Sequence, residues 1–174
     1  QGCLRSAMQK LRKWMKPNLN FNECDNFGQT GLIYAATAKH DDTVFEIISH
    51  AQELGIDLDF KKVNGPTGLG QYFRKVCEHG DLQNLEKLLK FVSLFDINEG
   101  DEHGQSGFFH ACWEGHEAVV KFLIQNSKRL NIDLNKAQKN GMTAFHTSCK
   151  NKHETIVDLI LESAEEFEID LTLK

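Results

Sequence analysis

Ile132-Asp133-Leu134-Asn135 is one copy of an apolar-polar-apolar-polar pattern that occurs five times in the 174-residue chain. The other copies begin at Leu19, Ile56, Phe95 and Ile169, so consecutive copies are 37, 39, 37 and 37 residues apart. A fixed period of about 20 to 50 residues is typical of stacked repeat proteins, in which each unit buries its apolar face only against its neighbours. The period therefore predicts an array that offers a long surface to another macromolecule.

Each period contains a turn signal followed by two helical patterns. Gly28, Gly65, Gly104 and Gly141 mark the turns, since glycine tolerates a positive φ. The first helical pattern is short and rich in small residues. The second has apolar residues at positions i, i+3 and i+4, which predicts one stripe facing the stack. These stripes are Val44, Ile47 and Ile48; Leu85, Leu88 and Leu89; Val120, Leu123 and Ile124; Val157, Ile160 and Leu161.

These residues resemble the ankyrin repeat, whose units combine a turn glycine, a Thr-Pro-Leu-His-like helix start, a Gly-His break and a Val-x-x-Leu-Leu second helix. Gly141-Met142-Thr143-Ala144-Phe145-His146 and Gly115-His116 carry the resemblance most closely. It implies an all-α, right-handed solenoid of about four helix-turn-helix repeats with hairpin fingers. We expect repeats at 23–59, 60–98, 99–135 and 136–174.

Several positions depart from that pattern. Gly107 and Ala144 replace the usual proline, and Phe109 replaces the usual histidine in the third repeat. The second repeat is the most divergent, and its segment 65–70 predicts a longer and looser finger. Units of 37 residues also predict longer second helices or longer loops after them.

The ends of the chain suggest a cap and a second function. Residues 1–22 contain five basic and no acidic residues and form an amphipathic pattern that ends at Pro17. We expect a capping helix or partial repeat there. The alternative is docking on a membrane surface or on a calmodulin-type partner, with Trp14 as anchor.

Composition and cysteine usage limit the other functions. The net charge of −5 argues against binding nucleic acid, and no apolar run approaches the roughly 20 residues that span a bilayer. Cys77, Cys112 and Cys149 share one repeat position, which predicts a small buried thiol. Five cysteines without a CxxC pair favour reduced thiols and a cytoplasmic or nuclear location.

Chemistry by this chain is not expected. His110, Cys112 and His116 are metal-capable, as are His146, Cys149 and His153, but helical geometry separates them. No nucleotide, dinucleotide or serine-nucleophile motif occurs. We therefore expect no enzyme activity, no metal and no cofactor.

The resemblance also implies which residues meet a partner. Outward positions flank the turn glycine or precede the helix break, on a concave groove. They are Asn26, Phe27, Gln29, Thr37 and Ala38; Glu78 and His79; Glu102, His103, Gln105, Trp113 and Glu114; Lys139, Asn140, Met142, Lys150 and Asn151. Trp113 is the most informative, because exposed tryptophans are enriched among residues that dominate binding. The alternative is that Trp113 packs onto the neighbouring repeat, against Lys150 or His79.

The sequence thus predicts non-enzymatic recognition of a protein partner that has a basic or apolar segment, by a monomer or weak oligomer. The alternative is a regulatory or targeting domain within a larger enzyme or channel. Asn22, Asn98 and Asn135 resemble asparagines that are hydroxylated in some ankyrin repeats, and an ordinary turn role is the alternative.

Overall fold

The computed structural model describes residue 25 and residues 31–38, 40–54 and 68–171 of the chain. Every regular element in these residues is helical. The elements are α2 (Gly31–Thr37), α3 (Asp41–Leu54), α4 (Gly68–Glu78), α5 (Leu82–Leu88), the 3₁₀ helix η1 (Leu89–Leu94), α6 (Gly107–Glu114), α7 (Glu117–Leu130), α8 (Ala144–Asn151) and α9 (Glu154–Phe167). The predicted all-α class is confirmed. The predicted capping helix at 1–22 lies outside the described residues.

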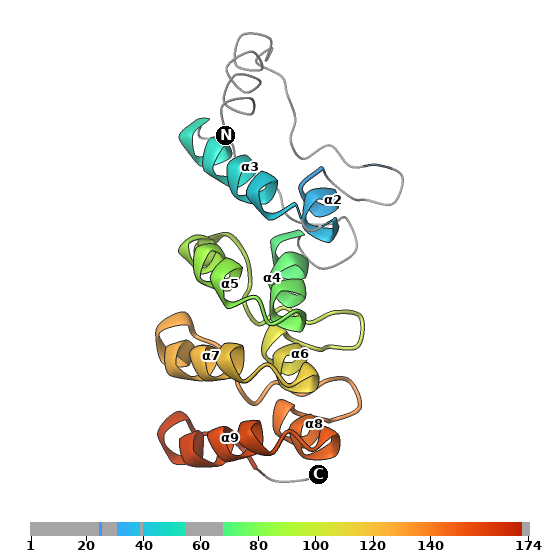
Figure 1. Ribbon diagram of the computed structural model, residues 1–174, viewed down its shortest axis with the longest axis vertical. Helices are drawn as coiled ribbons and strands as arrows, with labels where there is room; N and C mark the ends of the chain where they lie inside the picture. The colour runs from blue at the N-terminus through green and yellow to red at the C-terminus, as the bar shows by residue number, and fades with distance from the viewer. Residues whose placement is uncertain (1–24, 26–30, 39, 55–67, 172–174) are drawn as a thin grey trace.

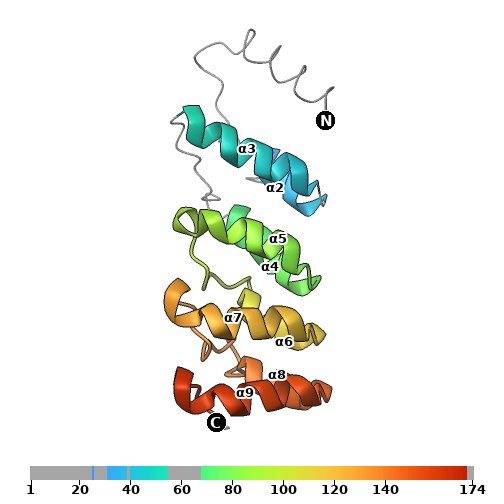
Figure 2. The same cartoon turned by 60° about the vertical axis from the view of Figure 1, so that its left-hand side comes forward.

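The helices form antiparallel pairs that stack along one axis (Figure 1). The first helices α2, α4, α6 and α8 make one column, and the second helices α3, α5, α7 and α9 make the other. A turned view shows each pair at its own level, with the blue-to-turquoise α2–α3 pair and the orange-to-red α8–α9 pair furthest apart (Figure 2). This arrangement confirms a solenoid of helical hairpins. The exact repeat boundaries stay a prediction.

The predicted apolar stripes are buried in α7 and in α5 with the start of η1, whereas Ile47 of α3 is half-buried. In α9 the prediction is wrong for Leu161, which is 46% exposed, because no described repeat covers that side of α9; Val157 is half-buried. In α7, Val120, Leu123 and Ile124 are all buried. Helices α3, α7 and α9 each run 14 residues, so the long period lengthens the second helix in these three repeats. In the second repeat, α5 has 7 residues and continues into η1. Asn131 and Glu168 end α7 and α9 in the left-handed backbone conformation that stops a helix.

The second repeat differs from the expectation of a loose finger. Helix α4 begins at Gly68, so residues 68–70 are helical despite their glycines. The prediction of an irregular segment is wrong for these three residues because Leu69 is fully buried, and its burial outweighs the low helix propensity of glycine. Residues 65–67 lie outside the described part.

Asn98 and Asn135 each join their repeat to the next one through two hydrogen bonds. The Asn98 side chain donates from Nδ2 to the carbonyl oxygen of Asn131 (2.7 Å) and accepts at Oδ1 from the amide of Asp133 (2.8 Å). One period later, Asn135 bonds the carbonyl of Glu168 (2.8 Å) and the amide of Asp170 (2.7 Å) in the same way. Each asparagine thus fixes the end of the next second helix, and this gives Asn98 and Asn135 a structural role.

The cysteine prediction holds for two of the three positions. Cys77 and Cys112 are buried, and burial raises the pKa of both thiols, that of Cys112 to about 12. Cys149 is exposed, so its predicted burial is wrong. Helix α8 belongs to the last described hairpin. Cys112 of α6 is covered by α8, but no described helix follows to cover Cys149 in the same way.

Candidate functional site

The end of α6 places Trp113 on the surface. The side chain is 37% exposed, and its ring lies 6.0 Å from the Phe109 ring, centroid to centroid. The ammonium Nζ of Lys150 lies 5.8 Å from the centroid of the Trp113 ring, within cation–π range. Trp113 is therefore both exposed and partly packed, which combines the two alternatives that its sequence position allows.

The backbone of Trp113 is fixed by the next repeat. Its carbonyl oxygen accepts from Asn151 Nδ2 (2.9 Å) and lies 2.9 Å from His153 Nε2. The same contact occurs one repeat earlier, where His116 Nε2 lies 2.8 Å from the carbonyl oxygen of Glu78. His116 and His153, which each follow the first helix of their repeat, therefore hold the residue at the end of the preceding first helix.

The end of α4 contributes Glu78 and the exposed His79. Lys75 Nζ donates to Glu78 Oε2 at 2.6 Å. Partial burial acts to raise the pKa of Glu78, but the Lys75 hydrogen bond and nearby positive charge outweigh it, so the pKa lies below its ordinary value. Glu78 is thus ionised and already paired, and it offers a partner less free charge than the sequence suggests.

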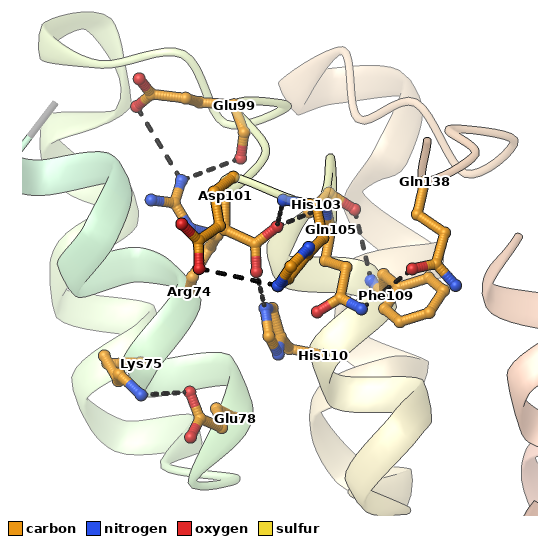
Figure 3. Close-up of polar contacts among 12 residues, drawn as sticks. Arg74, Lys75, Glu78, Glu99, Asp101, His103, Gln105, Phe109, His110 and Gln138 are labelled. Carbon is orange, nitrogen blue, oxygen red and sulfur yellow. Dashed lines mark hydrogen bonds and ion pairs between the residues drawn. The ribbon is translucent and has the colours of Figure 1, made fainter. Parts of the chain in front are cut away.

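The third-repeat finger is built around Asp101, which the sequence analysis did not include in the site. Asp101 Oδ1 accepts from the amides of His103 (2.8 Å) and Gln105 (2.9 Å), as Figure 3 shows. Burial acts to raise the pKa of Asp101, yet these amides and His110 bring it below the ordinary value. This bonding leaves the neighbouring side chains of Glu102 and His103 exposed at the fingertip. The signal in the sequence is the Asp-x-x-Gly turn.

Behind the finger lie His110, which the sequence analysis considered only as a metal ligand, and Arg74, which it did not consider. His110 Nε2 is 3.4 Å from Asp101 Oδ2, and the carboxylates of Asp101 and Glu78 favour its charged form. Burial outweighs them and holds the pKa of His110 below its ordinary value. The buried Arg74 donates from Nη1 to the Glu99 carbonyl at 3.0 Å, so α4 supports the finger that follows it (Figure 3).

The fourth-repeat finger continues the same surface. The Lys139 amide donates to the carbonyl of His103 (2.9 Å), and Gln105 Nε2 donates to Gln138 Oε1 (3.0 Å), so the two fingers are joined. Asn140 Oδ1 accepts from the Met142 amide at 3.0 Å. Lys139 and Asn140 are exposed, and Met142 is half-buried.

The structure therefore brings most of the predicted residues onto the helix ends and fingers of repeats two to four. We call this set the recognition surface: Glu78, His79, Glu102, His103, Gln105, Trp113, Glu114, Lys139, Asn140, Met142, Lys150 and Asn151. Asn26, Phe27 and Gln29 lie outside the described residues, and the side chain of Thr37 is not described. Ala38 is exposed after α2.

The metal-capable residues of repeat three do not converge. Cys112 is buried, His110 faces Asp101, and His116 bonds the Glu78 backbone. Across the described part of the chain, no group of three His, Cys, Asp or Glu side chains is placed to hold a metal ion. The same residues include no helix with the length and apolar character needed to cross a membrane.

Comparison with known proteins gives a family match and a short local match. A family model described as "Ankyrin repeats (3 copies)" matches residues 73–173. Proteins named "Scaffold protein ILK" from Homo sapiens, Mus musculus and Cavia porcellus are each 49% identical to this chain over 37 residues. That segment is 21% of this chain and 8% of each relative's length.

Proposed function

The chain belongs to the ankyrin repeat family, a family of protein interaction modules, and from this premise we propose that it binds a protein partner on the recognition surface without catalysing a reaction. The single observation that carries the proposal is Trp113. Trp113 is more than a third exposed, while its carbonyl is held by two side chains of the next repeat. A rigidly held and exposed tryptophan provides a large contact area at little entropic cost.

The chemistry of the surface defines the partner segment that we propose. An apolar side chain of the partner packs on Trp113 beside Phe109. A basic residue of the partner lies near the exposed carboxylates of Glu114 and of Glu102, whose Oε1 lies 3.6 Å from His103 Nε2. Such complementarity accelerates association more than it tightens the complex.

A scaffold role is consistent with the short match to the relatives named as scaffold proteins. Because the matched segment covers only 8% of those relatives, their other properties are not transferred. Within this proposal the chain acts in the cytoplasm or nucleus, either alone or as the targeting module of a larger protein.

The test compares proteins captured from cell extract by the purified chain and by two variants. Trp113→Ala removes the anchor, and Gln125→Ala changes an exposed residue of α7, away from the recognition surface. We expect Trp113→Ala to lose the specific partner, with a cost of about 2 kcal/mol or more in a direct titration with that partner. Gln125→Ala should retain it.

Circular dichroism melting separates lost binding from lost folding. Because Trp113 is partly exposed, its truncation should leave the helical content unchanged. A folded Trp113→Ala protein that binds the partner with the affinity of the parent chain would rule out this surface as the binding site.

A further inference from the structure

Four apolar positions of the α8–α9 hairpin are exposed or half-buried, although their equivalents in the preceding repeats are buried. We call Phe145, Cys149, Val157 and Leu161 the terminal face. Leu161 is 46% exposed, Cys149 is exposed, and the other two are half-buried. The buried equivalents are Phe108, Cys112, Val120 and Ile124 in the third repeat and Phe73, Cys77, Leu85 and Leu89 in the second.

Two of the buried equivalents, Phe73 and Cys112, show how the next repeat covers this face. A Cβ atom added to Gly107 would lie 2.3 Å from the Phe73 ring, so Phe73 packs against the start of α6. The Cys112 thiol likewise meets the Ser148 hydroxyl on α8. Ile156 and Ile160 of α9 are fully buried. The terminal face is therefore a formed stacking surface on a well-packed hairpin.

Lys152, the residue that follows the first helix of the last hairpin, restricts which hairpin can stack on this surface. Gly80 and Gly115 lie under the rings of His116 and His153, and an added Cβ would come within 2.5 Å and 2.6 Å of those rings. At the equivalent position of the fourth repeat stands Lys152, in the left-handed conformation with φ of 61°. Its Cβ occupies the space that a stacked histidine ring needs.

The sequence has a second position of this kind without glycine. In the sequence, Lys39 stands at the glycine position of the first repeat, and the following repeat has Asp81 where the others have His116 and His153. Asp81 caps α5 by accepting from the Asn84 amide at 3.0 Å. Asn84 in turn donates to Asp41 Oδ2 at 2.7 Å and joins α5 to the first repeat.

We propose that the terminal face binds a further ankyrin-type helical hairpin, stacked in the same register, with aspartate rather than histidine at its break position. The aspartate side chain is small enough to clear the Cβ of Lys152. Its negative charge also suits the ammonium of that lysine. The stacked hairpin buries Cys149 and Leu161 as the fourth repeat buries Cys112 and Ile124.

The test fuses a second copy of residues 138–174 directly after Lys174, which keeps the 37-residue step. Within the copy, Cys149→Ser leaves the original Cys149 as the reporter. One fusion keeps His153 in the copy, and the other carries His153→Asp there. Each is made with Lys152 and with Lys152→Gly in the original fourth repeat.

The measurement is the rate at which iodoacetamide alkylates the original Cys149, read by peptide mass spectrometry. With Lys152 present, the aspartate copy should slow alkylation by roughly tenfold or more relative to the parent chain, because the thiol reacts only when the hairpin opens. The histidine copy should slow alkylation by roughly twofold or less. Lys152→Gly should raise the protection by the histidine copy to about that of the aspartate copy.

Three outcomes would overturn the proposal. Unchanged alkylation in all four fusions would show that the terminal face does not accept a stacked hairpin. Equal protection by both copies in the presence of Lys152 would contradict the preference for aspartate. Protection of Cys149 in the parent chain that disappears on dilution would assign the face to a second copy of this chain.

Discussion

At the scale of single residues, Gly115 and Gly141 have almost the same backbone angle but different surroundings. Their φ values are 83° and 86°, which strain any residue that has a Cβ atom. An added Cβ on Gly115 would meet the His153 ring at 2.6 Å, whereas nothing lies within 4 Å of one on Gly141. Substituting the two glycines in turn therefore separates the cost of backbone strain from the cost of a steric clash with the next repeat.

We predict that Gly141→Ala lowers the free energy of unfolding by about 1 to 2 kcal/mol, through backbone strain alone. Gly115→Ala should cost at least about 1 kcal/mol more, because the His153 ring must also move. Urea unfolding followed by circular dichroism measures both. Equal costs would mean that the close contact between Gly115 and the His153 ring adds nothing to stability.

His110 gives the protein a defined response to acid. Burial lowers its pKa in the folded state, despite the nearby carboxylates of Asp101 and Glu78 and with a further small effect from Arg74. Below the ordinary value of 6.5, the unfolded chain therefore binds a proton more readily than the folded chain. Stability from neutral His110 is present above that pH and is lost as the pH falls toward the folded pKa.

We predict that His110→Gln loses less stability than the parent chain between about pH 7.5 and pH 5.5, because glutamine does not titrate. Urea unfolding at the two pH values measures the difference. The other histidines are common to both proteins, so they serve as the internal control. A larger loss in the variant would show that the carboxylates outweigh burial.

At the scale of elements, Asn98 and Asn135 connect one hairpin to the next at the ends of the second helices. Each side chain donates to the residue that ends the following second helix and accepts from an amide two residues further on. These bonds are short but exposed, and their net contribution should be about 1 kcal/mol for each asparagine. The two sites serve as controls for each other.

We predict that Asn135→Ala accelerates hydrogen exchange at the Asp170 amide and leaves the Asp133 amide unchanged. Asn98→Ala should do the reverse, since Asp133 is bonded by Asn98. Amide exchange measured by NMR tests both variants. Faster exchange at both amides in either variant would indicate that the two asparagine contacts between repeats open together.

At the scale of the whole molecule, the stack has a covered interior and an exposed last hairpin. Ile124 and Leu161 occupy equivalent positions one period apart, yet Ile124 is 2% exposed and Leu161 is 46% exposed. The neighbouring repeat accounts for the difference, because stability in a repeat array arises largely from the interfaces between units.

We predict that Ile124→Ala lowers the free energy of unfolding by about 2 to 5 kcal/mol, as for truncation in a packed core. Leu161→Ala should cost less than about 1 kcal/mol, because the side chain is only partly buried. Denaturant titration of the two variants compares them directly. A core-like cost at Leu161 would mean that the terminal face is covered in solution.

Much of the fold follows from local features of the sequence. The i, i+3, i+4 stripes around Leu123 and Ile160, the turn glycine Gly104 and the capping Ser106 act within a few residues, so periodicity indicates the helical hairpins. The 37-residue period adds the stacking, because a hairpin with one apolar face must bury it on a neighbour. Trp113 also follows from its register in the repeat.

The sequence by itself therefore determined the helical class, the repeat and the placement of most of the recognition surface, because these depend on spacing along the chain. Only the tertiary structure decided which charges are paired and which apolar positions are covered. Asp101 and His110 meet through folding of the finger, and Arg74 reaches Glu99 across 25 residues. Cys112 and Cys149 share one position in the pattern, but only Cys112 is buried, because burial depends on the neighbour that the three-dimensional stack supplies.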